Sequence, residues 1–549
     1  MGSFEFAPAP RPPGLNARYE RNGHQVPVSI GSLMTRNRVE FGALTAVFDG
    51  DVRLTWRELA DTAGRFAGFL GSRGVGPGDV VAWQAPNWWE SLAVAYGIWA
   101  AGAISAPVVP IYREHEVAAI VAAVRPACVV TAADFRNCRH PELVDEACRM
   151  AGWEPSVRVV LRGAATGWTP FEATMTGRPE IAADIDPDAP ALIGFTSGTT
   201  SGAKAVVHST RGLIASPVRS TRTSGTTWTD RAYMPAPVAH ATGLLSAIAV
   251  PLYTGASVVL RDRWDADQAI DDILAYKVTT SAGAAVFMKE LVDALDRRGM
   301  DRLPLPGGYP CGGSSIPTSL AEATEAKGLA PARAFGMTEC PGVTGSSPRL
   351  DPPHIRLATD GWIMPGCEVR VLGPDGAELP AGEAGEFLVR GPQLALGYID
   401  PEHTREGFTD EGWFRTGDLG FLTAHDTGGG EVRHSCQVTG RSKEIINRGG
   451  EKISVREIED ALVRHAEVLD AAVVPAPHER LGEQPAAFVQ LRPGAAVEPD
   501  GLASFLRAGG LAPQKIPRIW KYVDDLPRTA SGKIKKYALR ESLAGSAPA

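Results

Sequence analysis

Hydrophobic and polar residues alternate between two periodicities along the first part of the chain. Residues 55–74 place apolar side chains at helical spacing and end at a glycine, which predicts a helix. A short apolar run over 79–86 follows and predicts a buried strand. Residues 119–135 repeat this order. The repetition predicts an α/β fold of layered helices and largely parallel sheets.

The pattern changes twice after about residue 355. Short strand-like segments separated by many glycines and prolines fill residues 356–440, which predicts a small β-rich subdomain. Residues 454–477 then combine an amphipathic helix with a strand, as expected of a compact α+β domain. We therefore expect a large N-terminal domain over 1–440, with αβ subdomains over about 1–185 and 186–355, and a small C-terminal domain over 441–549.

Composition excludes several classes of protein. The chain of 549 residues is 44% hydrophobic and 21% charged, which is ordinary for a globular protein. Its formal net charge of −8 argues against a nucleic-acid partner. The seven cysteines form no CxxC pair and no zinc spacing, which is typical of free thiols in the cytoplasm. Glycine and proline interrupt the apolar run 91–112, so we expect no transmembrane segment.

Residues 195–210, FTSGTTSGAKAVVHST, are typical of a phosphate-binding loop. Five hydroxyl side chains and two glycines fill positions 196–202, and a lysine follows at 204. Glycines let backbone N–H groups turn toward an anion, and hydroxyls add donors without negative charge. The spacing differs from the Walker motif, and a plain surface loop is the alternative interpretation. The expected phosphate-binding residues are Thr196, Ser197, Gly198, Thr199, Thr200 and Lys204.

This loop and seven later segments resemble, in order, the signature segments of the acyl-adenylating (ANL) superfamily, and within it the acyl-CoA synthetases or AMP-dependent carboxylate–CoA ligases. Any one segment could arise by chance, but seven in order over most of the chain could not. The later segments are PAPVAHATG (235–243), CGGSSIP (311–317), FGMTE (335–339), GEFLVRGPQLALGY (385–398), WFRTGDLG (413–420), GRSKEIINRGGEKISVREIE (440–459) and PRTASGKIKK (527–536).

The resemblance implies an ATP-dependent reaction that uses Mg²⁺ and coenzyme A. Lys533 resembles the lysine that enters the site during acyl-adenylate formation, and His240 resembles the histidine that borders the acyl carboxylate. One ammonium between a carboxylate and a phosphate lowers the cost of bringing two anions together. The resemblance also implies that the C-terminal domain is mobile and pivots at Lys443.

The remaining expected site residues follow from the same resemblance. At the adenine and ribose these are Gly313, Ser314, Phe335, Gly336, Asp418 and Arg441. Glu339 and Thr199 are the expected metal ligands, because Mg²⁺ prefers hard oxygen donors. Gly449 and Gly450 are expected at coenzyme A, and His240, Gly283, Gly312 and Gly342 in the acyl pocket.

Three features depart from the family pattern. Ser201, Ala203 and Ala205 stand where relatives carry Gly, Pro and Gly, although Lys204 is kept. Phe335 replaces a tyrosine that many relatives have. Residues 421–438 form a longer segment than usual, which we interpret as an extended surface hairpin. Because Lys533, Glu339 and Asp418 are all present, we expect a working enzyme.

The expected reaction is formation of an acyl-adenylate, AMP and pyrophosphate, followed by formation of an acyl-CoA thioester. The alternatives are transfer to a carrier-protein thiol, or an inactive homologue that only binds nucleotide or acyl groups. Small residues dominate the expected acyl pocket, which favours a bulky apolar acid, alicyclic or terpenoid, aryl or medium-chain. The sequence leaves a homodimer open.

Overall fold

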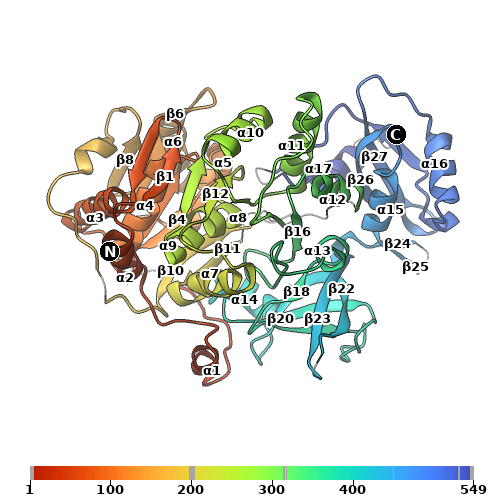
Figure 1. Cartoon of the computed structure of the whole chain (residues 1–549), viewed down its shortest axis with the longest axis horizontal. Helices are drawn as coiled ribbons and strands as arrows, with labels where there is room; N and C mark the ends of the chain where they lie inside the picture. The colour runs from red at the N-terminus through yellow and green to blue at the C-terminus, as the bar shows by residue number, and fades with distance from the viewer. Residues whose placement is uncertain are drawn as a thin grey trace.

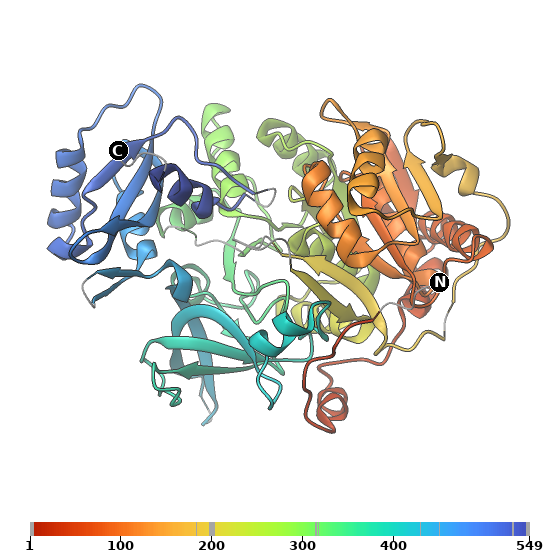
Figure 2. The same ribbon diagram turned by 180° about the vertical axis from the view of Figure 1, so that it is seen from behind.

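The computed structural model of the chain describes residues 5–182, 184–196, 204–312, 316, 318–428, 430–448, 451–529 and 532–544. Two αβ sheets with their helices lie at one end of the molecule (Figure 1). A β-rich sheet lies below the middle, and the sheet of the last hundred residues lies at the other end. Figure 2 shows the same arrangement from behind.

The largest sheet has eight strands in the order β21-β11-β10-β4-β3-β5-β8-β9. Strands β3 to β5, β8 and β9 run parallel, whereas β11 is antiparallel to β10 and β21. Its strands are β3 (Val80–Gln84), β4 (Ile104–Pro107), β5 (Cys128–Ala132), β8 (Val157–Leu161), β9 (Thr169–Pro170), β10 (Pro190–Phe195), β11 (Ala205–Ser209) and β21 (Gly397–Tyr398). A separate small ribbon pairs β6 (Asp134–Phe135) with β7 (Cys138–Arg139).

A second sheet has five strands in the order β14-β12-β13-β1-β2. All neighbours pair in parallel except β1 and β2. The strands are β1 (Thr45–Asp49), β2 (Val52–Thr55), β12 (Arg231–Met234), β13 (Ser257–Leu260) and β14 (Thr280–Ser281). A parallel pair, β15 (Tyr309–Gly312) and β16 (Pro331–Ala334), continues beside it.

The main hydrophobic core joins the two large sheets. Helix α4 is buried at every residue from Glu90 to Ala100, as expected for a helix covered on all sides. The helices of this part are α1 (Leu15–Arg21), α2 (Ile30–Glu40), α3 (Trp56–Ser72), α4 (Trp89–Ala100), α5 (Glu114–Val124), α6 (His140–Ala151), the 3₁₀ turn η1 (Phe171–Thr174), α7 (Thr210–Ser224), α8 (Ala241–Gly243), the π-helix η2 (Leu244–Ala249) and α9 (Val250–Thr254). Helix α3 begins at a capping box in which Thr55 and Glu58 bind each other's backbone N–H groups.

Further helices and a six-stranded sheet follow. The helices are α10 (Ala266–Ala275), α11 (Ala285–Arg297), α12 (Thr318–Ala326), α13 (Pro353–Ala358) and α14 (Pro401–Gly407). The sheet contains β17 (Thr344–Gly345), β18 (Trp362–Ile363), β19 (Glu368–Leu372), β20 (Gly385–Arg390), β22 (Phe414–Asp426) and β23 (Val432–Arg441). Helices α12 and α13 pack against β16, whereas α14 packs against β21 and β22. Strands β22 and β23 form a long hairpin whose described tip residues are exposed.

The C-terminal domain packs helices against a five-stranded sheet with its own hydrophobic core. Its strands are β24 (Ile446–Arg448), β25 (Glu451–Ile453), β26 (Val468–His478), β27 (Gly482–Leu491) and β28 (Ile519–Tyr522). Its helical segments are η3 (Ser442–Glu444), α15 (Val455–Leu462), α16 (Pro499–Ala508), η4 (Pro513–Lys515) and α17 (Lys536–Ala544).

The structure confirms the predicted fold class. It has a large N-terminal domain of α/β layers with a β-rich sheet, followed by a small α+β C-terminal domain. The seven cysteines are free, as expected. Within the described residues, no helix has both the length and the apolar character that crossing a bilayer requires.

Gly97 sets the distance between helices α3 and α4. A Cβ at this position would lie 2.7 Å from the Ala63 carbonyl oxygen and 2.8 Å from Phe66 Cδ1. We predict that Gly97→Ala lowers the midpoint of thermal unfolding by about 1–3 °C, corresponding to about 1–3 kcal/mol of overpacking in a chain of this size. A Cβ at Gly71, near the end of α3, would meet nothing within 4 Å, so Gly71→Ala is the matched control and stabilises slightly. Equal effects of the two substitutions would contradict the close approach at Gly97.

Candidate active site

A large cleft lies between the N-terminal and C-terminal domains. One wall is formed by most of residues 334–342 and by residues 414–417 of β22. The other wall comes from the C-terminal domain, with residues 473–475 of β26 and with Lys533 and Lys536. The cleft therefore brings together these four segments, which are far apart in the sequence.

Lys533 enters the cleft from the C-terminal domain. It follows a turn in which its N–H donates to Thr529 Oγ1 at 3.1 Å and its carbonyl accepts from the Thr529 N–H at 2.7 Å. Burial lowers the pKa of the Lys533 ammonium, and the Arg441 guanidinium lowers it further. The carboxylates of Asp418 and Glu339 act in the opposite direction. The ammonium thus lies among charged groups of the opposite wall.

Gly532 allows the Lys533 loop to approach the N-terminal domain. Its φ is +84°, and a Cβ there would lie 2.9 Å from Val286 Cγ1 and 3.3 Å from Ala284 Cβ. Both contacted residues lie at the start of α11. A side chain at this position would be strained by its backbone and would also push the loop away from α11. The sequence motif singled out Lys533, whereas the role of Gly532 appears only in the structure.

Lys536, one turn further on, joins three segments of the C-terminal domain. Its Nζ lies 3.0 Å from Glu444 Oε2 and 3.0 Å from Glu459 Oε1. Burial acts to lower the pKa of Lys536, but the two carboxylates outweigh it and raise that pKa. Burial raises the pKa of Glu459 to about 6. The start of α17 is therefore held to η3, which contains Glu444, and to α15, which contains Glu459.

Asp418 and Arg441 face each other across the β22–β23 hairpin. They are register partners, and Arg441 Nε donates to Asp418 Oδ1 at 2.9 Å. Asp418 is 4% exposed, and burial raises the pKa of its carboxyl group while Arg441 and Lys533 oppose that rise. The Arg441 side chain is about half exposed and lines the cleft. This arrangement places a carboxylate and a guanidinium side by side at the cleft wall.

Glu339 is held by a tyrosine from the neighbouring sheet. The Tyr398 hydroxyl donates to Glu339 Oε1 at 2.5 Å. Burial and the Glu339 charge raise the pKa of Tyr398, so its hydroxyl keeps the proton that it donates. Lys204 Nζ lies 5.5 Å from the centroid of the Tyr398 ring, within range of a cation–π contact. Lys204, Tyr398 and Glu339 therefore form one connected group in the cleft.

The segment 335–339 is packed tightly on its inner side. The Phe335 ring lies 5.8 Å from the Phe387 ring, and the Phe335 N–H donates to Thr344 Oγ1 at 3.0 Å. A Cβ at Gly336 would lie 2.6 Å from the Gly342 nitrogen. Glycine is therefore required at 336 by the close approach of two backbone segments. Phe335 and Gly336 both line the cleft.

His240 lies where the cleft opens into a second hollow, the inner pocket. It precedes α8, and its Nδ1 is buried without a hydrogen-bond partner among the described residues. Burial lowers the pKa of His240 to about 4, and the positive charge of Lys533 contributes. The imidazole is therefore neutral at neutral pH.

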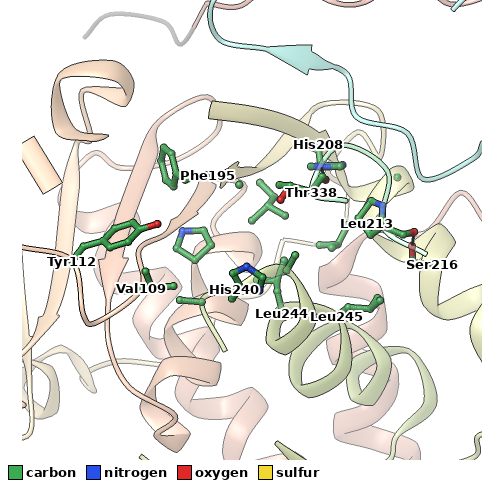
Figure 3. A pocket seen from close by; sticks show the side chains of 17 residues that line it. Val109, Tyr112, Phe195, His208, Leu213, Ser216, His240, Leu244, Leu245 and Thr338 are labelled. Atoms are coloured by element: carbon green, nitrogen blue, oxygen red, sulfur yellow. Dashed lines mark hydrogen bonds between the residues drawn. The ribbon is translucent and has the colours of Figure 1, made fainter. Parts of the chain in front are cut away.

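The inner pocket is mostly apolar (Figure 3). Its walls and mouth enclose about 730 Å³ of space between atoms, part of it open to solvent. Tyr112 and Val109 lie on one side of His240, and Leu213 and Ser216 lie on the other (Figure 3). The lining residues that sequence reasoning missed are Pro107, Val109, Tyr112, Leu192, Gly194, Phe195, His208, Gly212, Leu213, Ser216, Ala239, Ala241, Leu244, Leu245, Thr338 and Pro341.

The other predicted site residues fall in several places. Thr196, Gly312 and Gly342 line the cleft, and none of the three lines the inner pocket. Gly283 lines neither hollow, and a Cβ there would lie 2.6 Å from the Tyr309 hydroxyl. Lys443 belongs to η3. Predicted residues outside the described ranges are Ser197, Gly198, Thr199, Thr200, Gly313, Ser314, Gly449 and Gly450.

Two family models match the chain. The model of AMP-binding enzymes matches residues 35–399, and the model of the AMP-binding enzyme C-terminal domain matches residues 457–533. The chain belongs to the AMP-binding enzyme family. This membership confirms the resemblance found from the sequence motifs.

Named relatives cover almost the whole chain. The medium-chain fatty-acid–CoA ligase of Escherichia coli (strain K12) is 32% identical over 89% of this chain and 86% of its own length. The 3-[(3aS,4S,7aS)-7a-methyl-1,5-dioxo-octahydro-1H-inden-4-yl]propanoyl:CoA ligase of Rhodococcus jostii (strain RHA1) is 33% identical, over 94% and 99%. The solved structure of the anthranilate CoA ligase AuaEII in complex with anthranoyl-AMP has a TM-score of 0.85 at 25% identity, over 95% and 98%.

These relatives define the reaction class of the family member described here. The protein is an AMP-forming acid–thiol ligase. It uses ATP to convert a carboxylic acid into an acyl-adenylate and then forms the thioester with coenzyme A. The expected enzyme class is therefore confirmed.

The effect of Lys533 on the pKa of His240 can be predicted and measured without an activity assay. We expect NMR titration of His240 to give a pKa of about 4, because its imidazole is buried beside an ammonium. In Lys533→Met that pKa rises, because removing a positive charge favours protonation, yet it stays below about 6.5, the ordinary histidine value, because burial remains. The exposed Lys521→Met is the matched control. An unchanged His240 titration in Lys533→Met would show that the two side chains are not neighbours.

Proposed function

We propose that Lys533 is the catalytic cation of acyl-adenylate formation and that the acid to be activated occupies the inner pocket. The observation that carries this proposal is the convergence of Lys533 and His240 where the inner pocket meets the cleft. A carboxylate at this junction lies beside an ammonium and a neutral imidazole. The Lys533 ammonium then bridges the carboxylate and the α-phosphate of ATP, which reduces the repulsion between two anions.

ATP occupies the cleft in this proposal. Asp418 accepts hydrogen bonds from the ribose hydroxyls, with Arg441 beside it, and the Phe335 ring lies at the adenine. Lys204 and the hydroxyl-rich loop that begins at Thr196 contact the phosphates. The carboxylate oxygen attacks the α-phosphorus, the bond from that phosphorus to the bridging oxygen breaks, and pyrophosphate leaves.

Glu339 fits the part of a magnesium ligand. Its Oε1 accepts from the Tyr398 hydroxyl, and the residue lines the cleft. The described residues contain no cluster of three metal-ligating side chains. This donor set suits Mg²⁺, which commonly takes one or two carboxylates and otherwise phosphate oxygens and water. Bound there, the ion would neutralise phosphate charge. Thr199, the second expected ligand, lies outside the described residues.

The second half-reaction requires Lys533 to leave the cleft. We propose that the C-terminal domain rotates about Lys443, withdraws Lys533 and brings Gly449 and Gly450 beside the incoming thiol. The coenzyme A thiolate then attacks the acyl carbon and AMP departs. Such a rotation lets one cleft serve two reactions. The structure has Lys533 inside the cleft, which supports its use for the first half-reaction.

The substrate class follows from the walls of the inner pocket. Leucine, valine, proline, alanine and glycine provide most of its surface, and such walls favour an apolar acyl group over acetate. A ring-containing or medium-chain acid fits this chemistry. The named relatives act on a medium-chain fatty acid, on a bicyclic propanoate and on anthranilate, which supports the proposal.

The free cysteines support a reducing cytoplasm as the location of the protein.

A screen of carboxylic acids tests this function. We expect coenzyme A-dependent release of AMP and pyrophosphate with alicyclic, aryl or medium-chain acids, and little with acetate or amino acids. Omitting coenzyme A should leave pyrophosphate exchange intact, because adenylation precedes thioester formation. Turnover with acetate or amino acids alone would contradict the pocket argument. Exchange without any thioester would favour the alternative of a carrier-protein thiol, and binding without exchange would favour an inactive homologue.

Measuring the two half-reactions separately tests the proposed role of Lys533. Lys533→Ala should slow acyl-adenylate formation by about 10²–10³-fold and spare thioester formation from supplied acyl-adenylate. Gly532→Ala should act in the same selective way, because its Cβ would push the loop from α11. Gly510→Ala is the matched control, since Gly510 has φ +85° but no atom within 4 Å of its added Cβ. Equal loss of both half-reactions in Lys533→Ala would contradict the proposed domain rotation.

A further inference from the structure

The closed end of the inner pocket contains two polar side chains. Eight of the residues that line the pocket also line the cleft, so they mark its mouth. The residues that line the inner pocket alone are Pro107, Leu192, Gly194, His208, Gly212, Leu213, Ser216, Ala239 and Leu244. Among these, His208 and Ser216 alone have polar side chains, and both are buried. A polar pair at the end of an apolar pocket is where a ligand's own polar group would be recognised.

His208 presents a hydrogen-bond acceptor to the pocket. Its Nε2 lies 2.8 Å from the Thr338 carbonyl oxygen, and the two residues lie side by side in Figure 3. A carbonyl oxygen can only accept, so Nε2 carries the proton of the neutral ring. Burial lowers the pKa of His208 to about 4, so the ring is neutral at neutral pH. Nδ1 is then a lone-pair acceptor.

The Nδ1 of His208 has no hydrogen-bond partner among the residues that the structure describes. Nδ1 of His240 is fully buried and has no hydrogen-bond partner among the described residues, whereas Nδ1 of His208 is not one of these fully buried, unpaired atoms. The free acceptor of His208 therefore remains accessible from the pocket, although the residue as a whole is only 3% exposed.

Ser216 presents an acceptor as well. Its hydroxyl donates to the Pro341 carbonyl oxygen at 2.9 Å, which leaves only oxygen lone pairs for a ligand. The backbone N–H of Gly212, which also lines this end, is already used by Ser209 Oγ at 3.1 Å. The closed end thus offers acceptors from both polar side chains and no free donor from these three residues.

We propose that the closed end of the inner pocket is a recognition subsite for a hydrogen-bond donor on the acid, a hydroxyl or an N–H group located away from its carboxylate. The inference rests on the proposed function, because it assumes that the acyl group occupies this pocket. The preferred substrate class is then a ring-containing acid with a hydroxyl or amino substituent. A ketone or second carboxylate at the same position is rejected, because it would face two acceptors and leave them unpaired.

A shape-matched series of acids tests the subsite. The series comprises cyclohexanecarboxylic acids and benzoic acids with hydroxyl, methyl or oxygen-acceptor groups at positions 3 and 4. We expect at least one hydroxy acid to exceed its methyl and oxo or methoxy analogues by about 10-fold or more in kcat/KM, mainly through KM. A wild-type preference for the methyl or the acceptor-bearing acids at both positions would overturn the proposal.

Variants assign the preference to His208. In His208→Phe, which keeps a ring but has no acceptor, the hydroxy-to-methyl ratio of kcat/KM should fall toward one, whereas His208→Gln, which keeps a donor for Thr338 and an acceptor, should restore part of it. If His208→Phe does not fold, Ser216→Ala gives a second reading of the same ratio. Ser246→Ala removes a hydroxyl that lines the cleft but not the inner pocket, and should keep the ratio.

Two outcomes separate this inference from the proposed function. If acids of every kind fail to give AMP and acyl-CoA, the proposed function fails. If ring-containing acids react but His208→Phe changes hydroxy and methyl acids equally, the proposed function stands and the donor subsite is refuted.

Discussion

The rest of the site depends on a partly buried lysine ammonium, that of Lys533, between the two domains. Burying a positive charge is costly unless opposite charges lie nearby. Asp418 and Glu339 supply that compensation from the N-terminal domain, while Arg441 acts against it. The neutral state of His240 avoids a further positive charge at the same place. In the proposed first half-reaction, the carboxylate and the phosphates of ATP bring further negative charge to Lys533.

Much of this arrangement could be predicted from the sequence, because each charged residue lies in a segment whose spacing is distinctive. The motif containing Lys533 and the motif containing Asp418 fixed the residue identities, and strand pairing then placed Arg441 opposite Asp418. Helix and strand boundaries in 55–86 followed from periodicity, and the structure has α3 over 56–72 and β3 over 80–84. Each of these motifs lies within one short stretch of the chain, so its functional residues can be predicted from that stretch alone.

The pocket lining could not be predicted in this way. His208 lies in a strand of buried residues and Ser216 in a helix that is buried over most of its length, so both look like ordinary core positions in the sequence. The proton position on His208 depends on a carbonyl oxygen 130 residues further along the chain. Gly283 is the opposite case. It lies in a segment predicted to line the acyl pocket, but a Cβ there would meet the Tyr309 hydroxyl, and the residue lines neither hollow. These features depend on contacts between distant parts of the chain, so no short stretch of sequence predicts them.

The ion pairs of Lys536 have a consequence for how the enzyme changes between its half-reactions. Because Lys536 binds Glu444 in η3 and Glu459 in α15, the lysine-bearing loop, the interdomain turn and the body of the C-terminal domain are mechanically interlocked. Under the proposed rotation, Lys533 cannot slide out of the cleft by itself. In that rotation, the departure of Lys533 and the bending at residue 443 occur together, so the C-terminal domain has two positions, one for each half-reaction.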